Sequence, residues 1–289
     1  MKTTPLRQQF IKVLTLKGRS PRTIESYVGV VAKLARHYNR SPDLISDEEV
    51  REYLYHLHTK TNYSASTINV AINGLRFFYG EVLDRPLKRI EYSLPRFKHP
   101  VRRPQAYSLE EVHQLLEHGF TVPKYRTFFM TVYGCGLRIN EACHLKVKDI
   151  ERARKLVRIE QGKGKKDRYT ILPAHLLEEL RSYYRTYQPK HWLFEGVKNL
   201  QEPIQDRVVQ SAFQQGLKRA GLPRKGGPHS LRHSWATHLV DAGTPIHIIK
   251  RLLGHVSLTT TLGYLHISRK TLETVGNPLD SMIWTKPSL

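Results

Sequence analysis

Basic side chains in the C-terminal part of this 289-residue chain have types and spacings that suit chemistry on a phosphodiester. Transfer of a phosphodiester passes through a pentacoordinate phosphorus that carries extra negative charge. Without metal ions, that charge must be met by fixed guanidinium, ammonium and imidazole donors. The reaction also needs a nucleophile and a group that protonates the leaving oxygen. The sequence offers candidates for these roles.

Arg138 is the first candidate for binding the phosphate oxygens. It directly follows the glycine turn at 134–137 and stands near the expected start of a helix. That position combines a bidentate guanidinium with the positive end of a helix dipole. Glu141, three residues on, is placed to hold the arginine. Taken alone, an arginine beside an acidic residue is more often a surface ion pair.

Two further segments bring imidazole and guanidinium groups together. His229 and Arg232 are three residues apart, so they share one face of a helix that we expect to begin at or near His229. His255 follows Gly254, a natural C-terminal cap of an amphipathic helix. Considered alone, the first segment could equally well be an exposed basic turn, and a lone histidine after such a cap is usually structural.

The clearest strand signal is a hairpin with a basic tip. Residues 156–160 and 168–172 have the composition of strands, and they flank Gly-Lys-Gly-Lys-Lys-Asp at 162–167. A glycine-rich connection between two such runs is typical of a β-hairpin. Lysines at its tip are therefore candidates for protonating a leaving oxygen.

The charge balance indicates a polyanionic partner. Forty-seven Lys and Arg against 25 Asp and Glu give a net charge of +22, which favours nucleic acid or an anionic membrane surface over a merely soluble cationic surface. Membrane attachment is disfavoured, because no apolar run approaches the roughly 20 residues of a spanning helix and the N-terminus has no signal-peptide pattern.

We expect neither a metal nor another cofactor. The two cysteines, Cys135 and Cys143, lack a zinc-site spacing and read as reduced packing residues. Histidines at 229, 233 and 238 could suggest a metal, but no Asp, Glu or Cys ligand accompanies them. No Walker A motif occurs.

The elements that must position these residues are mainly helices. In the first hundred residues, Ser20, Ser46 and Ser64 each precede an apolar pattern with a 3.6-residue period, and a shorter helix is expected before Gly18. This pattern predicts a small helical bundle. Residues 93–106 then contain three prolines and four Lys or Arg, a composition that breaks helices.

These features predict three parts. Residues 1–92 form a helical domain, 93–106 form an extended basic linker, and 107–289 form a second domain with a C-terminal tail. The linker is favoured as a strap along a phosphate backbone over a passive spacer. The expected fold class is mainly α with a small β-hairpin or sheet. After Pro173 the pattern indicates helices to the end of the chain.

The joint pattern resembles the tyrosine recombinases, the phage integrase family in its broad sense. Five matching segments occur in the family's order: Gly-Cys-Gly-Leu-Arg at 134–138, Gly-Lys-Gly-Lys-Lys-Asp-Arg at 162–168, His-Ser-Leu-Arg-His at 229–233, Leu-Leu-Gly-His at 252–255, and Tyr264. The N-terminal bundle at 1–92, including residues 20–27, is similar to the family's core-binding domain, which implies a DNA-clamping role, and residues 107–289 are similar to its catalytic domain. The chain resembles both the Xer-like and the integron-integrase-like members of the family. The chain lacks the long insertion before His229 that integron integrases carry.

The resemblance implies a role for each residue. Tyr264 would attack phosphorus and form a 3′-phosphotyrosyl link, and Arg138 and Arg232 would clamp the non-bridging oxygens. Lys163 would protonate the leaving 5′ oxygen, with Lys165 as its rival. His229 and His255 would assist by hydrogen bonding and proton transfer. The implied catalytic residues are Arg138, Lys163, His229, Arg232, His255 and Tyr264.

The implied function is site-specific cleavage and rejoining of DNA, in integration, excision or resolution. The implied partner is double-stranded DNA with inverted half-sites, bound by a dimer at each site and a homotetramer on synapsed DNA, in the cytoplasm. Two alternatives remain open: a catalytically silent DNA-binding architectural protein, and a type IB topoisomerase-like enzyme.

Overall fold

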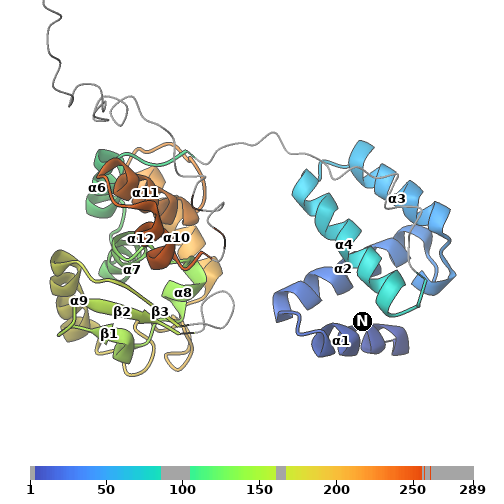
Figure 1. Cartoon of the computed structure of the whole chain (residues 1–289), viewed down its shortest axis with the longest axis horizontal. Helices are drawn as coiled ribbons and strands as arrows, with labels where there is room; N and C mark the ends of the chain where they lie inside the picture. The colour runs from blue at the N-terminus through green and yellow to red at the C-terminus, as the bar shows by residue number, and fades with distance from the viewer. Residues whose placement is uncertain (1–3, 86–104, 161–166, 256, 258–260, 262–289) are drawn as a thin grey trace, which may run out of the picture. The chain divides into compact units, whose positions relative to one another are not determined.

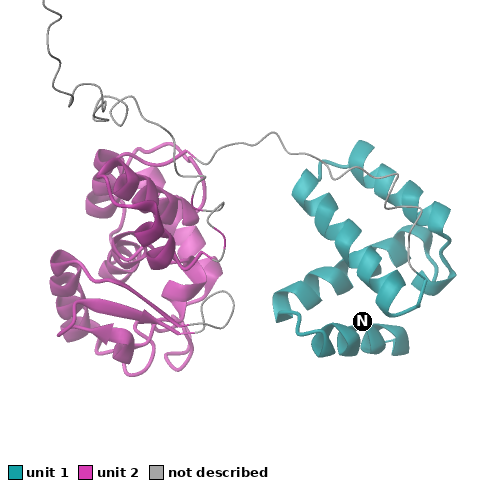
Figure 2. Cartoon of the chain, in the orientation of Figure 1, with its two compact units in different colours: residues 1–102 teal, residues 103–289 magenta. Residues whose placement is uncertain are grey.

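The chain forms two compact units, residues 1–102 and 103–289, each with a hydrophobic core of its own (Figure 2). The computed structural model describes residues 4–85, 105–160, 167–255, 257 and 261. These ranges are mainly helical and include one small antiparallel sheet (Figure 1), so the predicted fold class is confirmed. None of the helices in these ranges is long and apolar enough to cross a membrane. The predicted boundaries at 92 and 106 stay predictions, because most of the linker lies outside the described residues.

The first unit is the helical bundle that the apolar periodicity predicts. Ser20, Ser46 and Ser64 each cap a helix, accepting a hydrogen bond of 3.2 Å from the backbone N–H three residues on. Helices α2 and α4 cross in its centre (Figure 1), with Leu34 and Leu75 fully buried there. The elements of this unit are α1 (Pro5–Leu16), α2 (Pro21–Tyr38), the 3₁₀ turn η1 (Pro42–Leu44), α3 (Asp47–Thr59) and α4 (Ala65–Glu81).

The second unit combines helices with the predicted hairpin. Its elements are α6 (Leu109–His118), α7 (Pro123–Gly134), α8 (Ile139–Cys143), the 3₁₀ turn η2 (Val147–Asp149), β1 (Ile150–Glu151), β2 (Leu156–Ile159), β3 (Arg168–Ile171), α9 (Ala174–Tyr187), α10 (Asp206–Arg219), α11 (His229–Asp241) and α12 (Ile246–Leu253). Strands β2 and β3 pair antiparallel with Val157 opposite Thr170. A short strand, β1, joins the other edge of β2 and was not predicted.

The expectation of helix throughout the region after Pro173 is wrong for residues 188–205. This stretch is irregular and is fastened by two isolated β-bridges, Lys146 to Trp192 and Glu195 to Pro203. Leu193 and Phe194 within it are buried in the core. Burial against neighbouring elements therefore determines this segment's path, and a local periodicity does not reveal that.

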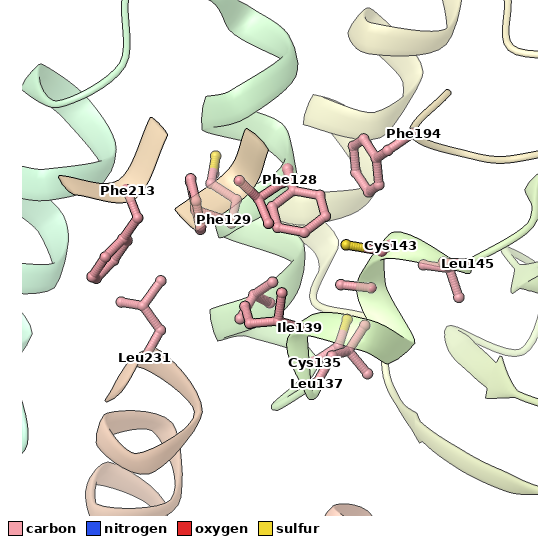
Figure 3. Packing of buried hydrophobic residues seen from close by; sticks show 14 of the residues in the cluster. Phe128, Phe129, Cys135, Leu137, Ile139, Cys143, Leu145, Phe194, Phe213 and Leu231 are labelled. Atoms are coloured by element: carbon pink, nitrogen blue, oxygen red, sulfur yellow. The ribbon is translucent and has the colours of Figure 1, made fainter. Parts of the chain in front are cut away.

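The core of the second unit is aromatic and contains both cysteines (Figure 3). Phe128 packs edge-on against Phe194, with ring centroids 5.1 Å apart. Cys135 and Cys143 are buried and free, and burial raises the pKa of each thiol to about 12. They are packing residues with protonated thiols, as the sequence indicates.

Gly136 determines how α7 ends and therefore where Arg138 begins. Its φ of +60° is a left-handed conformation, and the N–H of the next residue, Leu137, donates to Val132 O at 3.0 Å, as in a glycine-capped helix end. A Cβ at this position would lie 2.4 Å from the ring of Trp235 on α11. The absent side chain lets α7 and α11 approach closely.

We expect Gly136→Ala to lower the free energy of unfolding of the second unit by about 3 kcal/mol, because it adds a steric overlap to an unfavourable φ. Gly221→Ala is the matched control: its φ is +64°, but nothing lies within 4 Å of the added Cβ, so about 1 kcal/mol is expected. Urea unfolding followed by tryptophan fluorescence tests this, since Trp192, Trp235 and Trp284 all belong to the second unit. Equal losses in the two variants would contradict the steric argument.

Candidate active site

The centre of the site is the carboxylate of Glu141, on α8. It accepts hydrogen bonds from the backbone N–H of Arg138 at 2.8 Å and from the guanidinium of Arg138 at 2.7 Å. Arg168, the first residue of β3, donates to its two oxygens at 2.8 and 2.7 Å. The Glu141 side chain is only 8% exposed. Glu141 therefore holds Arg138 as predicted, and it joins the predicted hairpin to the same site.

The sequence-based argument that a helix dipole supports Arg138 needs correction. Arg138 is indeed the N-cap residue before α8, but that helix has only five residues. A helix this short has little dipole, because few peptide units are aligned. The guanidinium is oriented by the Glu141 carboxylate instead.

Arg232 reaches this site from α11. Its side chain is 7% exposed and lies 3.6 Å from Glu141 Oε2. The guanidinium donates to Gly136 O at 2.7 Å and to Leu253 O at 2.6 Å. Arg138 and Arg232, which the sequence separates by a long stretch, are thus brought to one carboxylate, and backbone carbonyls fix the second of them.

His255 extends the same network toward the C-terminal segment. Arg232 Nη2 lies 3.2 Å from His255 Nε2, and His255 Nδ1 lies 2.9 Å from Oγ1 of the buried Thr261. An arginine can only donate, so Nε2 accepts and the proton of the neutral ring is on Nδ1, which donates to Thr261. This arrangement fixes the orientation of the His255 ring.

His229 is the first residue of α11, as predicted, and this residue is exposed to solvent. Partial desolvation lowers the pKa of its ring; the charge of Asp206 opposes that change, and the charges of Arg232 and Arg138 add to it. A neutral imidazole at this position suits proton transfer near neutral pH.

The remaining predicted site residues, Lys163 and Tyr264, lie outside the described residues, as does Lys165. Within the ranges that the structure describes, no group of three or more His, Cys, Asp or Glu residues is placed to hold a metal ion.

Sequence reasoning missed two residues of this network, Arg168 and Thr261. Arg168 closes the Gly-Lys-Gly-Lys-Lys-Asp-Arg segment, and Thr261 ends the hydroxyl-rich run before Tyr264. Their presence in these segments was a signal, but a segment does not reveal which partner a side chain contacts.

The electrostatics of the site follow from the burial of Glu141. Burial alone raises the pKa of this carboxyl, but the hydrogen bonds and charge of Arg168, together with the hydrogen bonds from Arg138, outweigh it and lower the pKa to about 2. Glu141 is therefore ionised at neutral pH. Three guanidinium groups surround this one carboxylate, so the described cluster carries a surplus of positive charge.

Comparison with known proteins identifies the family. Residues 107–271 match the phage integrase family, and residues 6–89 match the phage integrase N-terminal SAM-like domain. The chain belongs to the phage integrase family, the tyrosine recombinases. It is 39% identical over 277 residues to a putative integrase/recombinase, y4qK, of Sinorhizobium fredii, which covers 96% of this chain and 89% of that protein.

Two further proteins are similar to this chain, one in sequence and one in fold. Tyrosine recombinase XerA of Thermococcus kodakarensis is 34% identical over 268 residues, covering 90% of each protein. The Tn1549 transposon integrase, solved in complex with transposon right end DNA, has the same fold, with a TM-score of 0.69 at 16% identity over 93% of this chain and 98% of that one.

We expect Glu141→Gln to destabilise the recombinase at neutral pH. A pKa lowered from 4.5 to about 2 corresponds to at most about 3.5 kcal/mol of stability, at about 1.4 kcal/mol per unit. Because the folded-state pKa is lowered, this contribution is present above about pH 4.5 and is lost as the pH falls toward 2. The difference in the free energy of unfolding between wild type and variant should therefore be at pH 3 about half, or less, of its value at pH 6.

Urea unfolding at the two pH values measures this difference. Glu178→Gln is the control, because Glu178 forms an exposed pair with Arg181 on α9 and should change stability by less than about 0.5 kcal/mol. A difference for Glu141→Gln that does not depend on pH would refute the electrostatic explanation.

Proposed function

We propose that this chain is a site-specific recombinase that cleaves and rejoins double-stranded DNA through a 3′-phosphotyrosyl link to Tyr264. The observation that carries the proposal is the gathering of Arg138 and Arg232 on the carboxylate of Glu141. Membership of the tyrosine recombinase family supports the reaction class.

The charge of the cluster favours a phosphodiester as its ligand. The guanidinium groups outnumber the carboxylate that they surround, and the whole chain carries +22. A phosphodiester anion would offset part of this surplus, and the charge that develops in the pentacoordinate state would be met by donors that are already oriented. Oriented donors need little reorganisation during the reaction.

Chain length supports Tyr264 as the nucleophile. Thr261 contacts His255, which contacts Arg232, and three residues span at most about 10 Å. Tyr264 follows Thr261 by only three residues in the sequence, and this short connection supports Tyr264 as the nucleophile. We further propose that Lys163 protonates the leaving 5′ oxygen, that His229 accepts the proton of Tyr264, and that His255 supports Arg232.

The finer features of the partner are part of the same proposal. The DNA would carry two inverted half-sites, each bound by one protomer. A dimer would occupy each site, and a homotetramer would hold two sites together, in the cytoplasm. The Tn1549 transposon integrase, which shares the fold, is known in complex with DNA, which supports DNA as the partner.

Replacing Tyr264 with Phe should abolish covalent attachment to DNA while leaving DNA affinity unchanged, since only the nucleophilic oxygen is lost. The measurement is an SDS-resistant adduct on a duplex selected by covalent capture with the wild-type chain. Tyr184→Phe, at an exposed tyrosine of α9, is the matched control and should form the adduct normally. An adduct formed by Tyr264→Phe would show that another residue is the nucleophile.

The proposal that Lys163 protonates the leaving 5′ oxygen can be tested by changing the leaving atom of the DNA. Lys163→Ala should slow cleavage of an ordinary duplex by about 100-fold or more, as expected for loss of a general acid. A 5′-bridging phosphorothiolate should restore the rate, because its thiolate leaves without protonation. Lys165→Ala serves as the comparison; rescue of Lys165→Ala and not of Lys163→Ala would assign the role to Lys165.

A further inference from the structure

Arg168 belongs to the cluster of side chains around Glu141. It begins β3, directly after the hairpin tip, and its side chain is only 10% exposed. Its two terminal nitrogens donate to the two oxygens of Glu141, and its Nε donates to Leu252 O at 3.0 Å. All three nitrogens of the guanidinium are thus engaged with the protein.

We propose that Arg168 is a positioning residue for strand cleavage: it saturates the Glu141 carboxylate and so prevents that carboxylate from capturing Arg232. This inference rests on the proposed function. It concerns how the phosphate-binding arginines are kept in place, and Arg168 itself contacts no reacting atom.

The first argument counts the acceptor positions of Glu141. A carboxylate offers about four lone-pair positions. Arg168 fills two, and the backbone and side chain of Arg138 fill two more. Arg232 remains at 3.6 Å from Oε2, beyond hydrogen-bonding distance. Without Arg168, two positions open beside Arg232, and a shift of a few tenths of an ångström would let Glu141 compete with a phosphate for this guanidinium.

The second argument is the contact between the hairpin and the end of α12. Gly254, the left-handed C-cap of α12, lies so close to Arg168 that a Cβ there would be 2.6 Å from Arg168 Cδ. Arg168 therefore fixes the distance between β3 and the helix end that leads directly to His255. The arginine links the strand that follows the lysine-bearing tip to the segment that precedes Tyr264.

The test compares cleavage with binding for the full-length chain, on a duplex selected by covalent capture with wild type. Arg168→Gln should slow formation of the SDS-resistant adduct by about 100-fold, the effect of losing one oriented donor to the transition state, while changing the DNA dissociation constant by less than about threefold. Arg154→Gln is the matched control, because it removes the same charge from an exposed side chain and should leave the cleavage rate unchanged.

Arg168→Lys keeps the charge but cannot form the two-pronged contact, and it should also slow cleavage at least 10-fold with normal binding. If Arg168→Gln fails to fold, this variant tests the proposal instead. Cleavage by Arg168→Lys at the wild-type rate would overturn the inference.

A double-mutant cycle separates positioning from a general loss of structure. If the released carboxylate captures Arg232, neutralising it should remove that competition, so Glu141→Gln should slow cleavage by a smaller factor in the Arg168→Gln background than in the wild-type background, where it only loosens Arg138. Multiplied losses would show independent roles and overturn the inference. Absence of an adduct with the wild-type chain would instead refute the proposed function, so the two failures are distinguishable.

Discussion

The described part of the active site depends on a buried carboxylate that must be compensated. An ionised carboxylate that is 8% exposed would be strongly destabilising alone, because burial removes its hydration. Glu141 is stable only because donors from its own helix and from β3 surround it, with Arg232 of α11 just beyond. Each of these elements contributes a cation, and without the carboxylate these cations would repel one another. The pairing thus determines the arrangement of the elements, and the same charge surplus makes the site attractive to an anion.

The end of α12 is the second constraint on the site. Its final carbonyls lack partners within the helix, and those of Leu252 and Leu253 are satisfied by the side chains of Arg168 and Arg232. Gly254 can adopt the left-handed cap that brings them close. Cations are favourable at a helix C-terminus. The two arginines therefore stabilise this end of α12 and are themselves fixed by it.

The sequence predicted the helical bundle, the hairpin and the helix starts well, because serine caps, glycine turns and apolar periods are local signals. It also pointed to Arg138, Arg232 and His255, which the structure brings into one network, through the order of the motifs. The irregular segment 188–205 was missed because its path depends on distant packing. Arg168 and Thr261 were missed as site residues for a related reason: a motif gives residue types, whereas their roles depend on partners 27 and 6 positions away in the chain.

The position of the carboxylate leaves these arginines able to bind an anion. Arginines packed together repel one another, so a site made of guanidiniums alone would spread apart until DNA bound. A carboxylate that shared its oxygens equally among all of them would hold them together but would also compete with the ligand. Here Glu141 is saturated by Arg168 and Arg138, and Arg232 is held by the carbonyls of Gly136 and Leu253 instead. Neutral carbonyls orient the guanidinium without cancelling its charge, so the positive field remains directed at the incoming anion.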